Sequence, residues 1–368
     1  MSKASADPSV TADALARLRA QIDTLDDEIL ARLNARAVLA REIGALKGDA
    51  SKVAIYRPER EAQVLRRIQT NNPGPLSGEV VARLFREVMS ACLALEKPLS
   101  IACLGPHGTF SEAASIKHFG HAAAVNPHAT IDDVFRAVEA GADDYGVVPV
   151  ENSTEGAVGR TLDLMTGTPL TVCGEVVLRV HQNLMRLPTA SGPVERVYSH
   201  AQSLAQCHEW LNRELPAAQR VPVASNAEAA RRATEDPTSA AIAGELAAER
   251  YGLTIVQPNI EDEPDNTTRF WVLGRHAAGP SGRDKTSLVV AARNRPGAVH
   301  QLLEPLARNN VSMSRLESRP ARTGLWEYVF FIDIEGHRDD PPVAAALAQL
   351  AEVAASVQVL GSYPMAVL

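Results

Sequence analysis

The sequence predicts a multidomain protein with an all-helical first part, an α/β middle part and a ferredoxin-like α+β last part. Its 368 residues are too many for one ordinary hydrophobic core, so we expect two or three domains. Residues 11–96 have only helical periodicity, whereas short β-rich runs alternate with helical ones from about residue 98. After a Gly/Pro/Ser linker, a β-α-β-β-α-β order closes the chain. The predicted domains are residues 1–97, 98–276 and 284–368.

Composition narrows the class of protein. With 45% hydrophobic and 22% charged residues the chain reads as globular, and no apolar run approaches the ~18 residues of a membrane span. The N-terminus lacks the apolar stretch of a secretory signal, so we expect a cytoplasmic protein. The four cysteines are scattered without a C-x-x-C pair, which favours neither disulfides nor a zinc site: Cys92, Cys103, Cys173 and Cys207.

Charge is distributed unevenly. The net charge of −7 argues against a nucleic-acid partner. Residues 1–97 nevertheless hold 15 Lys and Arg against 13 Asp and Glu, a net of +2, so the remainder carries −9. A basic first domain on an acidic protein indicates an anionic ligand for that domain.

The first domain is predicted to hold three helices, at about residues 13–47, 58–70 and 77–96. The segments between them are rich in Gly, Pro, Asn and Asp, which end helices. A helix of about 34 residues is long for a globular domain and suggests a bundle that pairs with another chain. One stripe at alternating steps of three and four predicts its buried face: Leu18, Ile22, Leu25, Ile29, Leu33, Arg36, Ala40, Ile43 and Lys47.

Two basic residues on that stripe suggest a ligand site. Arg36 and Lys47 are about 16 Å apart along the axis and could bracket a small dianion. Arg19 lies roughly 100° around the helix from Arg36, so it would serve the pocket of a partner chain. The alternative is that both basic side chains extend to solvent from the helix ends. On the third helix, Cys92 and Glu96 share a face.

These positions resemble the all-helical chorismate mutases, which form a domain-swapped dimer. The matching residues are Arg19, Arg36, Lys47, Arg60, Glu61 and Glu96. The resemblance implies that Arg19 (from the partner chain), Arg36 and Arg60 hold the carboxylates of chorismate. It implies that Lys47 and Glu96 face the ether oxygen whose bond breaks. Such a rearrangement needs a compact substrate conformer and donors aimed at developing negative charge.

Three further residues of the second and third helices belong to this expectation. Glu61 would contact a substrate hydroxyl, and Arg57 shares its helical face where some relatives carry an acidic residue. Some relatives also carry Gln where Glu96 stands. A carboxylate cannot donate to an ether oxygen, so Glu96 would have to be protonated, and we expect the reaction to be favoured at lower pH. Cys92, which shares a helical face with Glu96, is also expected to contact the substrate.

Three polar junctions in the α/β part predict a substrate cleft. Residues 105–114, 149–159 and 198–207 each follow a predicted strand and lead into a predicted helix. Helix N-termini bind anions through free N–H groups, and hydroxyls there add donors. Ordinary helix capping would explain any one of these junctions. Three in one domain favour a cleft.

A metal or nucleotide site is not predicted. His118, His121 and His128 have no acidic or cysteine ligand near them in the sequence. The stretch "GPHGTF" lacks the pattern of a phosphate-binding loop. We therefore expect no cofactor.

The junctions and the stretch "NTTRFWVLG" resemble prephenate dehydratase over about residues 100–275. The resemblance implies two α/β lobes, like a periplasmic binding protein, with the site between them. It implies conversion of prephenate to phenylpyruvate, with Thr268 as the acid on the departing hydroxyl and Arg269 and Phe270 beside it. Implied binding residues are Thr109, Ser111, Glu112, Asn152, Ser153, Thr154, Ser199, His200, Gln202 and Ser203. His200 is the competing candidate for the acid, because histidine is the commoner proton carrier.

Strand geometry distinguishes the two threonines of that stretch. A period of two puts Thr268 on one face with Phe270, and Thr267 on the other with Arg269. Only one face can look into the cleft, so Thr267 is predicted to be a bystander or a support for Arg269.

The last part resembles the ACT regulatory domain of such dehydratases, in which phenylalanine binds between paired domains and inhibits. The motifs are "NRPGAVHQLLEPL" and "SRLESRP". They imply an allosteric site that contains Gly297, Ala298, His300, Glu317, Ser318, Arg319 and Pro320. Taken alone, "RPG" would be a turn before a helix. His300 stands where relatives have an aliphatic residue, so inhibition could depend on pH.

Together these features indicate a bifunctional chorismate mutase–prephenate dehydratase of phenylalanine biosynthesis. We expect a homodimer with swapped mutase helices and inhibition by phenylalanine. One alternative is a dehydratase whose helical domain only dimerises. Another is a cytoplasmic solute-binding sensor, against which the "TRF" hydroxyl and the basic helical stripe argue.

Overall fold

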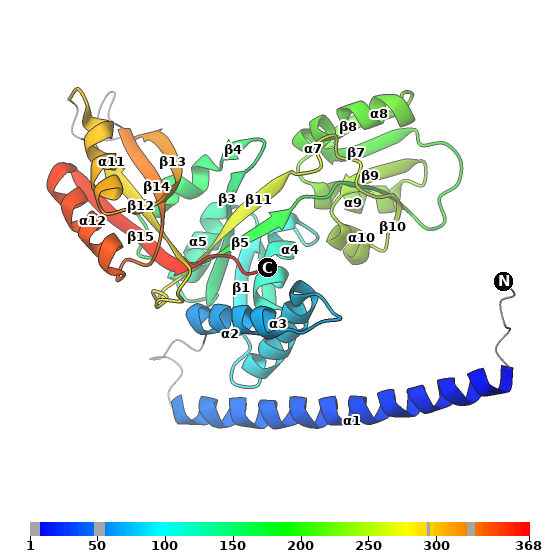
Figure 1. Ribbon diagram of the computed structural model, residues 1–368. Coiled ribbons are helices and arrows are strands. Elements are labelled where there is room, and N and C mark those ends of the chain that lie inside the picture. Colours follow the sequence, from blue (N-terminus) through cyan, green and yellow to red (C-terminus); the bar gives the residue numbers. More distant parts are fainter. Residues whose placement is uncertain (1–7, 48–55, 293–294, 322–327) are drawn as a thin grey trace, which may run out of the picture.

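The computed structural model describes residues 8–47, 56–292, 295–321 and 328–368 (Figure 1). A central lobe with a mixed β-sheet contacts the second lobe, the C-terminal module and the helices α2 and α3. The second lobe extends from one end of that sheet, the C-terminal module packs against its face, and two short helices cover the opposite side. The first helix runs below them as a separate rod.

The helical module has the three predicted helices: α1 (Pro8–Lys47), α2 (Pro58–Asn71) and α3 (Gly78–Ala94). Ser77 begins α3, because its side chain accepts a hydrogen bond from Val80 N at 3.3 Å. The helix ends at Ala94, two residues before the predicted end, since the chain turns there and Glu96 N donates to Leu93 O.

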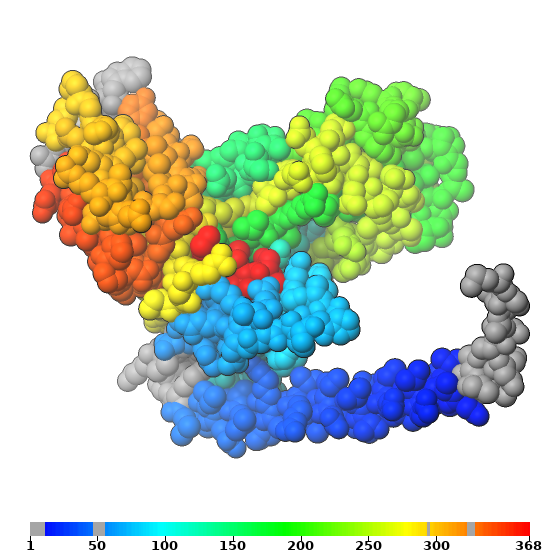
Figure 2. All heavy atoms as spheres, in the orientation of Figure 1, coloured from blue at the N-terminus to red at the C-terminus, as the bar shows by residue number. Residues whose placement is uncertain are grey.

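The apolar stripe of α1 is exposed within this chain. Leu18, Ile22, Leu25 and Ile29 are each more than half exposed, whereas the prediction gave them a buried face. Only the end of α1 near Gly44 reaches α3, where the side chain of Glu96 lies against Gly44. Figure 2 shows the N-terminal half of the helix standing clear of the rest. The stripe is therefore real, but nothing else in the described chain covers it.

The first lobe is a mixed sheet with strand order β2-β1-β3-β11-β5, and β4 pairs with β3. The three strands β2, β1 and β3 are parallel, and β11 is antiparallel to both of its neighbours. Its elements are β1 (Ser100–Leu104), α4 (Phe110–Phe119), β2 (Ala124–His128), α5 (Ile131–Glu139), β3 (Tyr145–Asn152), β4 (Gly156–Ala157), α6 (Gly159–Met165), β5 (Thr171–Arg179) and β11 (Thr267–Gly274).

The second lobe has strand order β10-β6-β9-β7-β8. Here too β8, β7 and β9 are parallel, while β6 and β10 run antiparallel. Both sheets are therefore mixed, because the strands that flank the two crossovers between the lobes pair antiparallel: β5 with β11 and β6 with β10. Its elements are β6 (Asn183–Arg186), β7 (Arg196–His200), α7 (Ala201–Gln206), α8 (His208–Glu214), β8 (Gln219–Val223), α9 (Asn226–Glu235), β9 (Ser239–Ala243), α10 (Glu245–Tyr251) and β10 (Thr254–Gln257).

The C-terminal module has the predicted β-α-β-β-α-β order and an antiparallel sheet, β13-β14-β12-β15. Its helices pack on one face around Leu288, Leu302 and Leu350. Its elements are β12 (Asp284–Ala291), α11 (Ala298–Arg308), β13 (Met313–Pro320), β14 (Tyr328–Glu335), α12 (Pro341–Val353) and β15 (Ser356–Pro364).

Strand β11 contributes to two separate cores through its two faces. Trp271 and Leu273 pack with α5, α6 and residues of the C-terminal sheet such as Phe331. Phe270 and Val272 pack on the other face with α4 and the residues around it. The predicted alternation of side chains along "NTTRFWVLG" is therefore present, and each face of β11 packs in a different core of the first lobe.

The end of the chain attaches the helical module to the other two. Arg66 of α2 donates to the carbonyl oxygens of Ser281, Arg283 and Met365, and to the Ser281 hydroxyl at 3.0 Å. Gln69 donates to Val367 O at 3.4 Å, one turn further along the helix. The last residues thus lie between α2 and the first lobe. Among the described residues, no helix is long and apolar enough to cross a membrane.

Gly361 allows β15 to dock on β5, and its substitution should separate the two domains. A β-carbon at this position would lie 2.0 Å from the carbonyl oxygen of Val172. We expect Gly361→Ala to lower the free energy of unfolding by about 1–3 kcal/mol, measured by urea denaturation. Gly167→Ala is the matched control, since nothing lies within 4 Å of its added carbon. Equal stability of the two variants would contradict this account.

Candidate active and regulatory sites

Thr268 accepts a hydrogen bond at the mouth of β11. Asn152 Nδ2 on the neighbouring β3 donates to Thr268 Oγ1 at 2.8 Å. The hydroxyl oxygen therefore has a donor on it, and its own proton remains available to a ligand. A donor on this oxygen also stabilises it when it gives up the proton.

Asn152 is fixed by the turn that follows it. Its side-chain oxygen accepts from Thr154 N at 3.1 Å, from Thr154 Oγ1 at 2.7 Å and from Glu155 N at 3.1 Å. Ser153 accepts from Thr267 N at 2.9 Å. The expected strand-to-helix junction is corrected here, because the short strand β4 intervenes and α6 begins only at Gly159. The hydroxyls orient a turn and do not cap a helix.

The two threonines differ as the strand period predicts. Thr267 Oγ1 donates to the carbonyl oxygen of Asp265 at 3.1 Å, outside the Asn152 cluster. Asn266, directly before them, accepts from Asn152 at 2.9 Å and was missed in the sequence. Its position directly before the T-T-R-F run could have identified it from the sequence.

A second polar cluster stands at the carboxyl ends of the parallel strands in the second lobe. Ser199 is fully buried and donates to Ile242 O at 2.8 Å. Asn226, at the start of α9, accepts from His200 N at 3.1 Å and donates to Ser203 Oγ at 2.9 Å. Asn226 was also missed, although "VASNAEAA" is one more polar junction before a helix. The N-cap of α7 is His200, whose Nδ1 accepts from Gln202 N at 3.4 Å.

The crossover between lobes joins the two clusters. Val180 N donates to Asn266 O at 2.8 Å, and two residues on, Gln182 donates to Ser203 Oγ at 3.0 Å. Two residues of extended chain span only about 7 Å. The polar groups around Thr268 and around Ser203 thus lie at the two ends of one short segment.

A cavity of about 640 Å³ also lies between the lobes, on the side of α4 and α10. Of the predicted substrate contacts only Thr109 lines it. Thr109 caps α4, accepting from Glu112 N at 3.3 Å, and Ser111 is buried in the first turn. This junction has the predicted form.

Glu112, expected as a substrate contact, links the two lobes in this chain. Its carboxylate is fully buried and accepts from Gly108 N, and it lies 3.0 Å from His107 and 2.7 Å from Arg250 of α10. Burial alone would raise its pKa, but these donors lower it below the ordinary value. Both side-chain oxygens thus have partners within the protein, and the substrate contact stays a prediction.

Arg269 and Phe270, expected beside Thr268 in the substrate site, both have partners inside the protein. Arg269 is on the face opposite to Thr268 and pairs with Asp333 of the C-terminal module. Phe270 is 1% exposed and packs in the core beneath Thr268. Arg269 therefore makes an interdomain contact, because the strand period places it on the face opposite to Thr268. Phe270 supports Thr268 from below, because the core encloses its side chain.

The mutase candidates are only partly brought together in one chain. Glu96 lies against Gly44, one turn before Lys47, whose side chain is outside the described part. Arg36 is half-buried on the same helix, and Arg19 is exposed far along it. Arg57 and Arg60 are exposed on α2, and Cys92 is buried in α3.

Glu61, expected to contact a substrate hydroxyl, forms an internal ion pair in this chain. It lies 3.3 Å from Arg86 of α3, in a small cavity with His118 and Glu175 of the first lobe. Burial raises the pKa of its carboxyl, and Arg86 opposes that shift. This side of α2 faces the first lobe.

The three histidines considered for a metal have separate partners. His118 contacts Tyr56 at 2.9 Å, His121 contacts Glu87 at 3.0 Å and His128 contacts Asp143 at 3.0 Å. No group of metal-binding side chains gathers elsewhere in the ranges that the structure describes.

The predicted allosteric residues flank one edge of the C-terminal sheet. Gly297 has φ of +77° and begins α11, a conformation that suits glycine, and Ala298 and His300 follow on that helix. Glu317, Ser318 and Pro320 lie on the edge strand β13. Arg319 instead reaches Asp163 of α6 at 2.9 Å, so it joins the module to the first lobe.

Three family matches cover most of the chain in sequence order. Residues 18–97 match Chorismate mutase type II, residues 101–278 match Prephenate dehydratase, and residues 286–352 match the ACT domain. The bifunctional chorismate mutase/prephenate dehydratase of Neisseria gonorrhoeae is 60% identical over 353 residues, covering 95% of this chain and 97% of that protein. The chain belongs to this bifunctional family.

Other relatives agree with that membership. The bifunctional chorismate mutase/prephenate dehydratase of Stutzerimonas stutzeri is 51% identical and covers 97% of this chain and 99% of its own. The crystal structure of prephenate dehydratase from Arthrobacter aurescens, in complex with L-Phe, is 37% identical with a TM-score of 0.66. It covers 72% of this chain and 90% of its own. The family's members are named as enzymes, so we set aside the solute-binding sensor.

The environment of His118 predicts how stability depends on pH. Burial, followed by repulsion from Arg86, holds its pKa well below 6.5, so the folded state keeps the ring neutral. The unfolded chain takes up this proton below about pH 6.5, and stability should then fall by up to ~1.4 kcal/mol per pH unit. His118→Gln should flatten the loss of thermal stability between pH 7.5 and 5.5. The exposed His121→Gln is the control; an identical pH slope in all three proteins would contradict the assignment.

Proposed function

We propose that the chain catalyses two consecutive reactions: rearrangement of chorismate to prephenate, then decarboxylating dehydration of prephenate to phenylpyruvate. The proposed domains are residues 1–97, 98–276 and 284–368. The hydrogen bond from Asn152 to Thr268 is the observation on which the dehydratase reaction rests, because it leaves the proton of the Thr268 hydroxyl free to be donated. Membership in the bifunctional family supports both.

In the dehydratase step, Thr268 Oγ gives its proton to the departing hydroxyl of prephenate, which leaves as water. The electron pair of the breaking bond to the carboxylate moves into the ring as carbon dioxide leaves. The ring becomes aromatic, which drives the transfer from a weak acid. The donor from Asn152 stabilises the threonine oxygen while it is deprotonated.

The remaining binding residues are proposed to hold the substrate from both lobes. They are Thr109, Ser111, Asn152, Ser153 and Thr154 from the first lobe and Ser199, His200, Gln202 and Ser203 from the second. Asn226 and Asn266 join this set through their contacts with Ser203 and Asn152. His200 stays the competing acid, since its Nδ1 accepts from Gln202 N and leaves the other nitrogen to carry a proton.

The mutase site is proposed to need a second copy of the chain. Arg19 and Arg36 are about 25 Å apart along α1 at its rise per residue, too far to hold one small substrate. A partner helix laid along the exposed stripe would cover Leu18, Ile22 and Leu25 and bring its own Arg19 to the pocket. We therefore propose a homodimer in which Arg36, Lys47, Arg57, Arg60, Cys92 and Glu96 form each pocket with the partner's Arg19.

Regulation is proposed to act through the C-terminal module, with phenylalanine as the inhibitor. Gly297, Ala298 and His300 on one element and Glu317 and Ser318 on another would form its site between paired modules. Glu317 supplies a carboxylate for the α-ammonium group. A cytoplasmic location remains part of the proposal.

The decisive experiment gives chorismate to the purified protein and identifies the products, with and without phenylalanine. We expect prephenate and then phenylpyruvate, and less phenylpyruvate when phenylalanine is present. If phenylpyruvate formed from prephenate but not from chorismate, the helical module would have no mutase activity and would serve only for dimerisation.

Thr268→Ala should reduce the dehydratase kcat by at least about 100-fold, because it removes the proposed proton donor. Thr267→Ala, on the opposite face, should lose less than about threefold, and both should keep the mutase rate. Steady-state assays with prephenate and with chorismate measure the two activities separately. If His200→Gln were inactive and Thr268→Ala active, the acid would be His200.

Glu96→Gln should flatten the pH dependence of the mutase. The native carboxyl can donate to the ether oxygen only when protonated, whereas an amide donates at every pH. We expect wild-type mutase activity to fall from pH 5 to pH 9 and the variant to change little. A wild-type rate that is constant over this range would refute the role of Glu96.

A further inference from the structure

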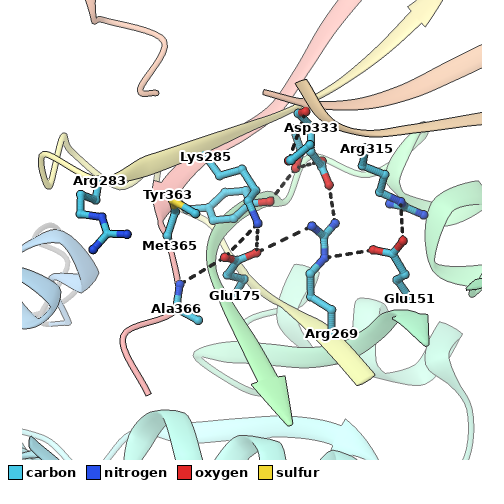
Figure 3. A network of polar contacts seen from close by, with 12 residues as sticks. Glu151, Glu175, Arg269, Arg283, Lys285, Arg315, Asp333, Tyr363, Met365 and Ala366 are labelled. Atoms are coloured by element: carbon cyan, nitrogen blue, oxygen red, sulfur yellow. Dashed lines mark hydrogen bonds and ion pairs between the residues drawn. The ribbon is translucent and has the colours of Figure 1, made fainter. Parts of the chain in front are cut away.

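Six charged side chains meet where the first lobe contacts the C-terminal module (Figure 3). They include Arg269, which lies on the face of β11 opposite to Thr268. Three are cationic and three anionic: Arg269, Lys285, Arg315, Glu151, Glu175 and Asp333. The side chain of Glu151 is 37% exposed, and the other five are 12% exposed or less. A buried charge is tolerated only while its partners remain, so the members of this cluster constrain one another.

Arg269 is the one member next to the proposed acid. Its guanidinium donates to Asp333 of β14 and lies 3.6 Å from Glu151 and 3.8 Å from Glu175. Asp333 is held in turn by Ser287, which donates to its second oxygen at 2.5 Å. Burial would lower the pKa of Arg269, but Asp333 and its neighbours raise it above the usual value, so the side chain stays charged.

The pairing of β11 with β3 is irregular next to Arg269, so a side-chain anchor there matters for the strand. Thr268 pairs with Asn152 and Arg269 with Glu151, but Phe270 pairs with Pro149, so the register shifts between Arg269 and Phe270 and β3 carries the extra residue, whereas the pairing with β5 stays in register from Thr267 to Val272. A bulge re-aims the residues next to it and weakens the local ladder. Consecutive Cα atoms are only 3.8 Å apart, so whatever fixes Arg269 also limits Thr268.

We propose that Arg269 is a positioning residue for the dehydratase reaction, held by Asp333 so that the C-terminal module sets the placement of the Thr268 hydroxyl. The proposal rests on the proposed function, in which Thr268 is the acid. Arg269 itself does not touch the substrate. It acts from the back of the strand.

The same cluster reaches the strand that carries the proposed inhibitor contacts. Arg315 of β13 pairs in register with Asp333, and Glu317 follows two residues later. Arg315 is 8% exposed, and its guanidinium has no hydrogen-bond partner among the residues that the structure describes. Its one carboxylate neighbour is Glu151, at 3.6 Å, which also faces Arg269. A shift of β13 on ligand binding would therefore change the charges around Arg269 first.

The test compares two variants of the full-length protein that each break an ion pair of the same domain interface. Asp333→Asn removes the negative charge that pairs with Arg269, and Asp163→Asn removes the one that pairs with Arg319. We expect Asp333→Asn to reduce the dehydratase kcat about tenfold or more with KM for prephenate within about twofold, because a small misplacement of a catalytic group is costly. Inhibition by phenylalanine should weaken in the same variant. Asp163→Asn should keep the kcat of the wild type.

Direct binding of substrate by Arg269 would give the opposite pattern. Arg269→Gln would then raise KM, and Asp333→Asn would leave both kcat and inhibition unchanged; that result overturns the proposal. If Asp333→Asn also loses mutase activity, the double variant Arg269→Met with Asp333→Asn takes its place, because it leaves no unpaired charge. Wild-type kcat in the double variant would likewise overturn it.

A measurement that does not depend on turnover separates this inference from the proposed function. Hydrogen–deuterium exchange of the amides of residues 266–270 should be faster in Asp333→Asn than in the wild type and unchanged in Asp163→Asn. Unchanged exchange in Asp333→Asn would overturn the positioning role. If the exchange changed in Asp333→Asn as expected but the wild-type protein were inactive on prephenate, the proposed dehydratase reaction would be wrong, including the role of Thr268 as its acid.

Discussion

The ion pair between Arg269 and Asp333 fixes how two domains are placed on one another. Neither charge can be left alone in a buried interface, so the sheet of the C-terminal module must present Asp333 to the back of β11. The close approach of Gly361 to Val172 and the hydrogen bond from Thr171 to Leu360 O at 2.9 Å define the same orientation from the neighbouring strand. The opposite face of β11 carries Thr268.

Local pattern was sufficient for much of this architecture. The three helices of the first module, the order of the C-terminal module and the two faces of β11 all follow from periods of 3.6 and 2 that neighbouring residues carry. The roles of Arg269 and Glu112 could not be predicted this way. Their partners, Asp333 and Arg250, are 64 and 138 residues away, and a single sequence has no signal for such pairs. Resemblance to a family identified these positions as important without saying what they touch.

The first helix illustrates a different limit of sequence patterns. Its stripe predicted an apolar face, and the face exists, but a pattern does not state which molecule covers it. The described chain leaves Leu25 and Ile29 in solvent and places only the end of α1 against α3. Antiparallel pairing of two such helices would satisfy both the stripe and the basic residues on it. The strand directions in the two lobes meet the same limit, since pairing across the crossovers involves strands that are distant in the sequence.

The contacts of the C-terminal residues have a consequence for how the protein is made. Arg66 and Gln69 of α2 donate to Met365 O and Val367 O, and Ala366 N donates to Glu175 at 3.2 Å. During synthesis these acceptors leave the ribosome only after the C-terminal module has been made. The first module can fold its helices early, but α2 cannot form these hydrogen bonds until residues 365–367 have emerged. Final assembly of the three domains therefore follows the synthesis of the C-terminal module, although each of their cores can form in order.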